Sequence, residues 1–196
     1  MRSWHIPAVL GLIALLFVAL LGVELMRGPA AVTLGKPRDL PDSLLFNENG
    51  DTVALNNASG GWMLLFPGFT HCPDICPATL SRLATIADSL NPARVVMLSV
   101  DPERDAPERL RDYVQYFHPS FGALVPTSPD HLAAVAPALG VAYRKVPLAQ
   151  GYTVDHSTAM PLISPEGQVI AFFPDFHDPS TLIIKIREII GMHGAK

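Results

Sequence analysis

The feature that most constrains the fold is a pair of short apolar runs separated by a helical pattern. Residues 62–66 (WMLLF) and 94–100 (RVVMLSV) are continuous and largely apolar, as is typical of strands buried on both faces. Between them, Pro77 suits the first turn of a helix, and apolar residues follow at helical spacing from Leu80 to Leu90. The order strand, helix, strand predicts a βαβ unit with a right-handed crossover.

Local start signals predict the remaining elements of the body. Asp105 with Glu108 forms a capping-box pattern, which predicts a helix through about Phe117. Helix-start residues predict two helices, at 128–139 and from residue 178 onward. A turn between two apolar runs predicts a β-hairpin with strands at 160–164 and 169–173. The whole order predicts an α/β, thioredoxin-like fold: the βαβ unit, then the β-hairpin and a C-terminal helix.

The N-terminal part carries an apolar run that is long enough to cross a membrane. From Ile6 to Met26 it contains one charge, Glu24, and it approaches the ~20 residues of a spanning helix. It exceeds the ~7–15 residues of a cleavable signal's core, so we expect an uncleaved anchor, although small residues at 28–30 would suit cleavage. The predicted organisation is a head at 1–5, a transmembrane anchor at 6–26, a linker at 27–40 and the thioredoxin-like domain at 41–192.

Charge and motifs exclude several classes of function. The net charge is −4 and lysines and arginines do not cluster, so no nucleic-acid partner is expected. The sequence has no P-loop, no HExxH motif and no glycine-rich dinucleotide signature.

The two cysteines of the chain, Cys72 and Cys76, lie within the stretch PGFTHCPDICPATL. On a helical turn their side chains would share one face with Cα atoms roughly 6 Å apart, which permits a disulfide or the joint binding of a soft metal ion. The adjoining helix start should lower their thiol pKa values. A purely structural disulfide would close too short a loop to stabilise the chain much, and a structural zinc site would need more ligands.

A third ligand would separate metal binding from redox chemistry, and His156 is the candidate among seven histidines. It stands in a predicted loop just before the hairpin, and in a thioredoxin-like sheet this loop lies beside the cysteine loop. Two thiolates and one imidazole suit copper, with sulfur favouring Cu(I) and nitrogen helping to hold Cu(II). His71 adjoins Cys72, but neighbouring side chains on an extended segment point to opposite sides, so we expect it to orient the loop.

Three motifs together resemble the Sco/SenC family of copper chaperones. They are GFTHCPDICP at 68–77, SVDPERDAPE at 99–108, and VDHS at 154–157 followed by a strand and SPEG. The resemblance spans roughly residues 40–190. It implies a membrane-anchored, thioredoxin-like protein that helps to assemble the copper centre of cytochrome c oxidase, with the copper-bearing oxidase subunit and a copper donor protein as partners. It also implies a single pass through the bacterial inner membrane, with the soluble domain in the periplasm or an equivalent compartment.

The resemblance also assigns roles to individual residues. Cys72 and Cys76 match the metal-binding cysteines of the family, and His156 matches its histidine ligand. Asp155 matches the acidic residue before that histidine, and the DPERD stretch at 101–105 matches a loop near the site. Asp155 and His71 are expected to support the ligands rather than to bind copper.

Two prolines depart from the family pattern. Pro161 replaces an aromatic residue and lacks an N–H, so we expect a bulge or a late start of its strand. Pro67 stands before Gly68, where the family has an aromatic residue. The FPGFT stretch faintly resembles peroxiredoxins, but position 71 is histidine where their pattern requires threonine, so a peroxidase is not expected.

Three function classes stay open on the sequence. The leading hypothesis is a copper metallochaperone rather than an enzyme. The alternative is a thiol–disulfide oxidoreductase that acts on the cysteines of an oxidase subunit or another exported protein, although the common redox motif has the shorter C-x-x-C spacing. The third is a signalling protein that senses redox state or copper.

Overall fold

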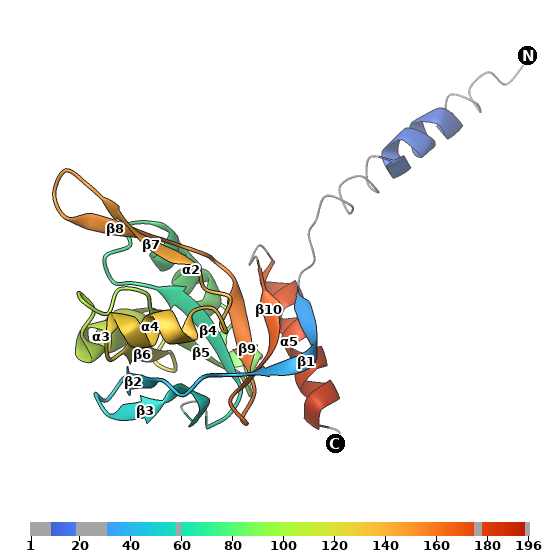
Figure 1. The fold of residues 1–196 in the computed structure, drawn as a ribbon. Helices are drawn as coiled ribbons and strands as arrows, with labels where there is room; N and C mark the ends of the chain where they lie inside the picture. The colour runs from blue at the N-terminus through green and yellow to red at the C-terminus, as the bar shows by residue number, and fades with distance from the viewer. Residues whose placement is uncertain (1–8, 19–30, 58–59, 175–177, 195–196) are drawn as a thin grey trace, which may run out of the picture. The chain divides into compact units, whose positions relative to one another are not determined.

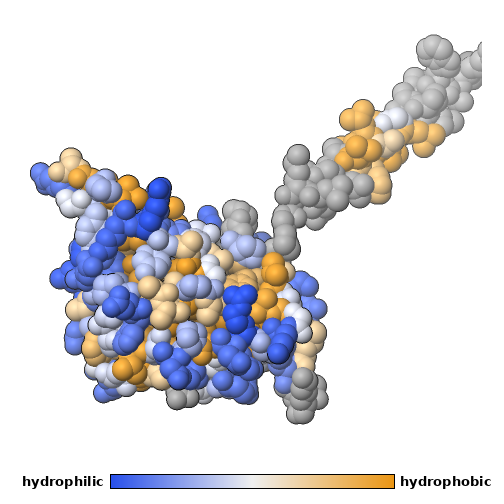
Figure 2. Space-filling model, viewed as in Figure 1, coloured by the Kyte–Doolittle hydropathy of each residue, from blue (hydrophilic) through white to orange (hydrophobic). Residues whose placement is uncertain are grey.

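The computed structural model describes residues 9–18, 31–57, 60–174 and 178–194, in two units, Met1–Ala30 and Ala31–Lys196. In the first unit, residues 9–18 form a helix whose apolar side chains are exposed (Figure 2). Among the described residues, no helix is both long enough and apolar enough to cross a membrane. The predicted head at 1–5 and much of the predicted anchor at 6–26 lie outside the described residues.

The second unit is built on ten strands. They are β1 Val32–Asp39, β2 Leu44–Asn47, β3 Thr52–Ala54, β4 Met63–Gly68, β5 Arg94–Ser99, β6 Gly122–Pro126, β7 Tyr143–Pro147, β8 Tyr152–His156, β9 Met160–Ile163 and β10 Gln168–Phe173. Eight of them form one sheet with the order β1-β10-β9-β4-β5-β6-β2-β3 (Figure 1). β4, β5 and β6 run parallel, and every other neighbouring pair is antiparallel. β7 and β8 form a separate two-stranded sheet.

Helices cover both faces of the large sheet. They are α2 Ile75–Ala84, α3 Pro107–Phe117, α4 Pro129–Val135 and α5 Pro179–Gly194, with 3-10 turns η1 Leu55–Asn57 and η2 Ala87–Leu90. Alternate residues of a strand face opposite sides, so Leu64 and Phe66 of β4 pack with α2, α3 and α5, whereas Met63 and Leu65 pack with α4. Every residue of β4 is buried, which explains its continuous apolar sequence.

The predicted thioredoxin-like elements are present: β4-α2-β5 is the βαβ unit, β9-β10 is the hairpin, and α5 is the last helix. The predicted helix through Leu90 is interrupted, because α2 ends at Ala84 and the turn η2 follows. At the break, the Thr85 hydroxyl donates to the carbonyl of Arg82 at 2.7 Å. Such a side-chain bond competes with the helical hydrogen-bond pattern.

The prediction of a linker at 27–40 is wrong for residues 32–39, which form strand β1. β1 pairs antiparallel with β10, with Thr33 opposite Ala171 and Arg38 opposite Val169. The strand lies at the edge of the sheet and most of its side chains are exposed, so its sequence lacks an apolar pattern. Its backbone hydrogen bonds come from β10, a partner that no local pattern reveals. The compact unit therefore begins at Ala31 rather than at residue 41.

Of the three predicted helix starts, those at Ser128 and Asp178 are confirmed and the one at Asp105 is corrected. Ser128 Oγ accepts from the backbone N–H of His131 at 3.3 Å, and Asp178 accepts from the N–H groups of Ser180 and Thr181. α4 ends at Val135, earlier than predicted.

The predicted capping box at Asp105 is absent. α3 has Ala106 at its N-cap and no side-chain capping bond, because the carboxylate of Asp105 is bonded to Thr70 and Ser99 instead.

Two details near His156 also differ from prediction. His156 is the last residue of strand β8 rather than part of a loop. β9 begins at Met160, so Pro161 does not delay it, and β4 pairs with β9 only from Leu162 onward. Pro161 precedes Leu162 and so lies outside the β4–β9 ladder, where its missing N–H is not needed. The irregularity in register lies in β10, between Val169 and Ala171.

Candidate metal centre

Cys72 lies in the loop just before α2 and Cys76 in the first turn of that helix, so the two do not share a helical turn as predicted. The N–H of Cys72 donates to the carbonyl of Phe69 at 3.2 Å, and the N–H of Cys76 donates to Cys72 Sγ at 3.3 Å. The N-cap residue Asp74 makes no side-chain capping bond, so the sulfur of Cys72 satisfies one of the free donors of the first turn. Both cysteines are free thiols; Cys72 is half-buried and Cys76 is buried.

Burial changes the expected acidity of the second thiol. The sequence predicts lowered thiol pKa values, but burial raises the pKa of Cys76 well above its ordinary value, and hydrogen bonding with the Cys72 side chain raises it further. The desolvation of a buried anion thus outweighs the dipole at the helix start. At neutral pH the Cys76 thiol holds its proton until a metal or an oxidant displaces it.

His156 approaches the cysteines from β8. Its Nε2 lies 3.9 Å from Cys76 Sγ, and its Nδ1 lies 2.9 Å from the carbonyl of Ser157. A carbonyl only accepts hydrogen bonds, so Nδ1 carries a proton, and the tautomer that this bond favours has the Nε2 lone pair directed to the sulfur. The ring of Phe69 meets the imidazole edge to face, with centroids 6.0 Å apart, and restricts its rotation.

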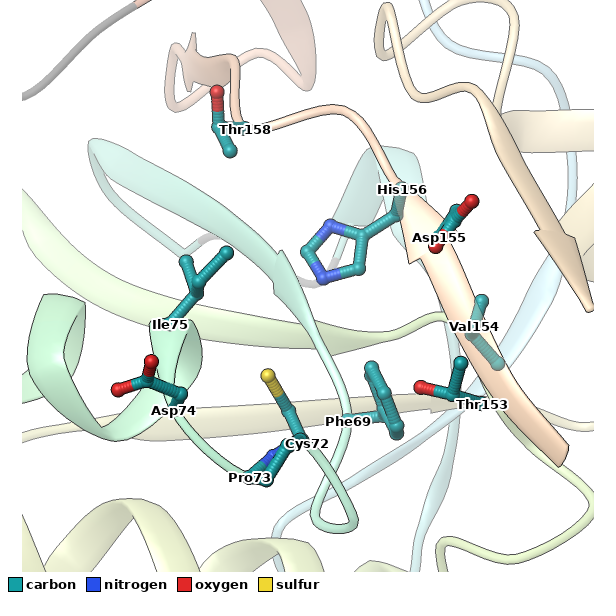
Figure 3. A pocket seen from close by; sticks show the side chains of 10 residues that line it. All are labelled: Phe69, Cys72, Pro73, Asp74, Ile75, Thr153, Val154, Asp155, His156 and Thr158. Carbon is teal, nitrogen blue, oxygen red and sulfur yellow. The ribbon is translucent and has the colours of Figure 1, made fainter. Parts of the chain in front are cut away.

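These groups border a cavity of about 340 Å³ between the cysteine loop and β8. Figure 3 shows the sulfur of Cys72 and the ring of His156 directed into it from opposite sides. The lining residues are Phe69, Cys72, Pro73, Asp74, Ile75, Thr153, Val154, Asp155, His156 and Thr158. Cys76 lies behind this surface, so a ligand that enters the cavity meets Cys72 and His156 first.

The donors fit a soft metal ion. Metal–sulfur and metal–nitrogen bonds of about 2.3 and 2.0 Å together exceed the 3.9 Å between Cys76 Sγ and His156 Nε2, so one ion can bond both atoms. Two thiolates and an imidazole are a donor set that suits copper. Within the described part of the chain, no three His, Cys, Asp or Glu side chains are already gathered around a metal position. The Cys72 side chain therefore has to adjust if all three donors bind together.

Gly68 provides the space between strand β4 and the sulfur of Cys76. A Cβ atom on Gly68, the last residue of β4, would lie 3.2 Å from Cys76 Sγ and 2.5 Å from Met97 Cε. A side chain at this position would require Met97 to move and the buried sulfur to shift by a few tenths of an ångström.

The two predicted supporting residues do not contact the His156 ring. His71 is exposed, and its Nδ1 lies 3.1 Å from the hydroxyl of Thr70, which gives its own proton to Asp105 at 2.6 Å. The hydroxyl therefore accepts from His71. Asp155 lines the cavity, but its carboxylate is bonded to Arg144 at 2.8 Å.

The group that orients the imidazole is the backbone carbonyl of Ser157, which the sequence analysis did not identify. A main-chain acceptor leaves no signal in residue types. The local pattern predicts Asp105 as a helix cap and the family resemblance places it in a loop near the site; its carboxylate is hydrogen-bonded to the cysteine loop through Thr70.

The fold and the motifs match known proteins. The model of the SCO1/SenC family matches residues 38–191. The mitochondrial SCO1 homolog 1 of Arabidopsis thaliana is 36% identical over 168 residues, which are 82% of this chain and 48% of that protein. A Stutzerimonas stutzeri protein named for copper binding is 32% identical over 142 residues, 69% of each chain.

A solved structure shows the same architecture. The crystal structure of Arabidopsis thaliana ScoI with copper bound superposes with a TM-score of 0.71 at 36% identity, covering 78% of this chain and 98% of that one. The chain spans about half of the length of its Arabidopsis mitochondrial relative. With a family model that covers most of the second unit, and a relative of this identity, the chain belongs to the SCO1/SenC family.

Proposed function

We propose that this chain is a copper metallochaperone that carries its metal on Cys72, Cys76 and His156. The observation that carries the proposal is the meeting of a CxxxC thiol pair with an imidazole 80 residues away in sequence. The copper in the Arabidopsis ScoI structure and the name of the Stutzerimonas relative support the choice of metal. We further propose that a copper donor protein loads the site, and that the recipient is the copper-bearing subunit of cytochrome c oxidase, as the family resemblance implies.

The three proposed ligands contribute differently to the binding of Cu(I) and of Cu(II). Two thiolates suffice for Cu(I), which tolerates low coordination, whereas Cu(II) gains from the nitrogen donor of His156. Binding displaces the proton of Cys76, and the Nε2 lone pair of His156 needs no proton change because Ser157 already fixes the tautomer. The cavity gives a recipient's ligands access on the side of Cys72 and His156, which suits stepwise transfer of the ion.

We propose that the apolar run from Ile6 to Met26 anchors the protein in the bacterial inner membrane, with the second unit in the periplasm. The argument is the length of the run and its single charge. An exported domain also faces an oxidising compartment, where a pair of neighbouring thiols can be oxidised reversibly.

A second candidate function is thiol–disulfide exchange. The observation that favours it is the unequal exposure of the pair: Cys72 lines the cavity, and Cys76, four residues later, is buried. The Cys72 thiolate would attack a disulfide of an exported protein and form a mixed disulfide. Cys76 would then displace it, so that the recipient gains two thiols and this chain gains one disulfide. The high pKa of Cys76 makes this second step slow.

Copper titration of the full chain separates the two functions. The reduced protein should bind one Cu(I) per chain in competition with a chelator of known affinity, and Cys72→Ser or Cys76→Ser should abolish tight binding. If the reduced wild type binds Cu(I) no more tightly than the Cys72→Ser variant and also reduces disulfides in a model substrate, the chaperone function is rejected in favour of the oxidoreductase.

A further inference from the structure

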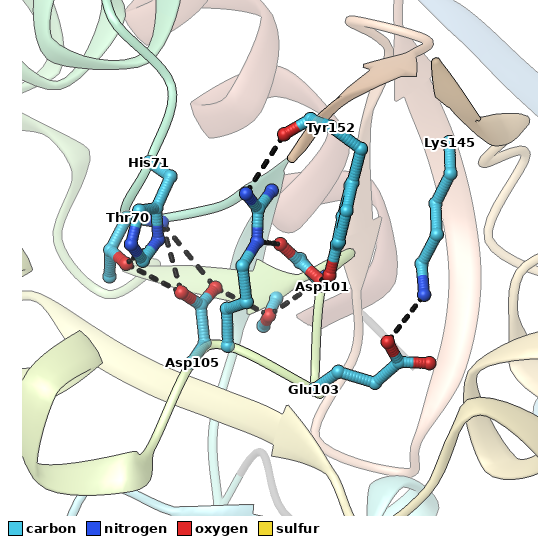
Figure 4. Close-up of polar contacts among 9 residues, drawn as sticks. Thr70, His71, Asp101, Glu103, Asp105, Lys145 and Tyr152 are labelled. Carbon is cyan, nitrogen blue, oxygen red and sulfur yellow. Dashed lines mark hydrogen bonds and ion pairs between the residues drawn. The ribbon is translucent and has the colours of Figure 1, made fainter. Parts of the chain in front are cut away.

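Residues 101–105, here called the bridging loop, follow β5 and carry two almost completely buried carboxylates. Asp101 is 0% exposed and Asp105 is 3% exposed. Buried carboxylates are costly unless hydrogen bonds or opposite charges compensate them. Neither carboxylate caps α3. Asp105 is bonded instead to the segment that carries the cysteines, and Asp101 to the strand that carries His156 (Figure 4).

One end of the bridging loop is bonded to the cysteine segment. Asp105 accepts from the Thr70 hydroxyl at 2.6 Å and from the Thr70 N–H at 3.2 Å, and its other oxygen accepts from the Ser99 hydroxyl at 2.6 Å. Thr70 lies two residues before Cys72, so the carboxylate fixes the start of the loop that holds the sulfurs.

The other end is bonded to the histidine strand. The hydroxyl of Tyr152, the first residue of β8, donates to Asp101 at 2.8 Å. Arg104 forms an ion pair with Asp101, donates to the carbonyl of Tyr152 at 2.9 Å, and stacks its guanidinium 3.8 Å from the centre of the Tyr152 ring. His156 ends the same short strand, so these contacts hold the base of the segment that carries the imidazole.

Further contacts link the two sides. Arg104 also lies 5.8 Å from the ring of Phe69, which packs against His156. On the surface, Glu103 pairs with Lys145 of β7 at 2.5 Å, and Lys145 lies 4.8 Å from the Tyr152 ring. Four of the five residues, Asp101, Glu103, Arg104 and Asp105, thus contact the cysteine segment or the strands of the β7–β8 sheet.

We propose that the bridging loop is a positioning element that sets the separation between Cys76 and His156, and so determines how well the site holds Cu(II) relative to Cu(I). The inference rests on the proposed copper ligands. The two cysteines are four residues apart, in the loop before α2 and in its first turn, so their proximity is a local property. The imidazole belongs to a separate sheet, and its distance from the sulfurs depends on tertiary contacts, of which the bridging loop makes several.

Tyr152→Phe in the full chain tests this role, because it removes the hydroxyl bonded to Asp101 and keeps the ring that stacks on Arg104. Loss of an outer partner costs about 10–100-fold in metal affinity, and we expect a loss of this size for Cu(II), with a changed thiolate-to-Cu(II) absorption band. Cu(I) affinity should stay unchanged. Tyr143→Phe is the matched control, since the Tyr143 hydroxyl makes no hydrogen bond with the described residues and this variant should bind both ions normally.

The cysteine side is tested by a rescue pair. Thr70→Val removes the hydroxyl that bonds Asp105 and should weaken Cu(II) in the same way, whereas Thr70→Ser keeps the hydroxyl and should retain wild-type binding. In a His156→Ala background, Tyr152→Phe should have no further effect on Cu(II), because the positioned group is gone.

Two outcomes would overturn the proposal. Tyr152→Phe could melt at a lower temperature yet keep the Cu(II) affinity and spectrum of the wild type, or Tyr143→Phe could weaken Cu(II) as much as Tyr152→Phe does. If His156→Ala abolishes the Cu(II) band and Tyr152→Phe does not, the ligand assignment stands and only the positioning role fails. If His156→Ala itself leaves the band intact, the proposed ligand set is wrong and the bridging loop has no ligand to position.

Discussion

Nε2 of His156 lies 3.9 Å from Sγ of Cys76, although His156 ends strand β8, Cys76 lies in helix α2, and the two residues are 80 positions apart. The two cysteines are only four residues apart, in the loop before α2 and in its first turn, but the nitrogen is brought by packing between a separate hairpin and the cysteine loop. Sulfur and nitrogen donors therefore depend on different parts of the fold, and variants can separate their contributions.

His156→Ala should weaken Cu(II) binding by about 10-fold or more and leave Cu(I) binding much less affected, because two thiolates still hold Cu(I). Competition titrations in each oxidation state measure the difference. His71→Ala is the matched control: its ring is exposed and bonded to Thr70, so it should be milder. Loss of the Cu(II) spectrum in His71→Ala, with a normal spectrum in His156→Ala, would contradict the assignment.

Oxidation of the two cysteines should form a reversible intramolecular disulfide and remove most of the affinity for copper, because a disulfide sulfur is a poor ligand compared with a thiolate. The measurement is copper binding before and after oxidation, with thiol counting to confirm the state. Equal affinities of the two states would exclude ligation by the sulfurs.

The reduced protein should lose stability with rising pH above about pH 9, where an ordinary thiol is largely ionised. Burial raises the pKa of Cys76 in the folded state, so the unfolded chain releases this proton first. The free energy of unfolding then falls by about 1.4 kcal/mol per pH unit in that range. Above about pH 10, Tyr113, whose pKa burial also raises, adds to the effect.

Denaturant unfolding between about pH 9 and 10 isolates the thiol from the tyrosine. Cys76→Ala should remove the loss of stability in this range, and Cys72→Ala should keep it. A slope that survives in Cys76→Ala would show that the buried thiol is not its source.

Gly68→Ala should destabilise the protein by about 1 kcal/mol, because the added Cβ requires the flexible end of Met97 to move and the ring of Phe66 and the sulfur of Cys76 to shift slightly. It should also weaken copper binding by displacing that sulfur. Gly35→Ala is the control, since a Cβ there meets no atom within 4 Å. Thermal melts and Cu(I) titrations of both variants test the prediction, and equal behaviour of the two would contradict it.

The full-length protein should stay in the membrane fraction after carbonate washing, because an apolar helix from Ile6 to Met26 would be held by the bilayer core. N-terminal sequencing of the mature protein is the second measurement. A start near Ala31 would refute the anchor and leave export intact.

The sequence by itself determined the local parts of the molecule. Continuous apolar runs predicted β4 and β5, helical spacing and proline predicted α2, and the CxxxC spacing placed two cysteines close together beside the start of that helix. Capping by Ser128 and Asp178 was also predictable. These features depend on residues within a few positions of one another, so local preferences are enough to specify them.

Only the tertiary structure decided the rest. β1 is a strand because β10 supplies its hydrogen bonds, and His156 faces Cys76 because the β7–β8 sheet is held against the cysteine loop. Asp105 is matched by sequence to a helix cap, yet burial directs its carboxylate to Thr70 and Ser99. A charge taken out of water bonds to whatever donors the packing brings near it, and those donors come from distant parts of the chain, where no local pattern can indicate them.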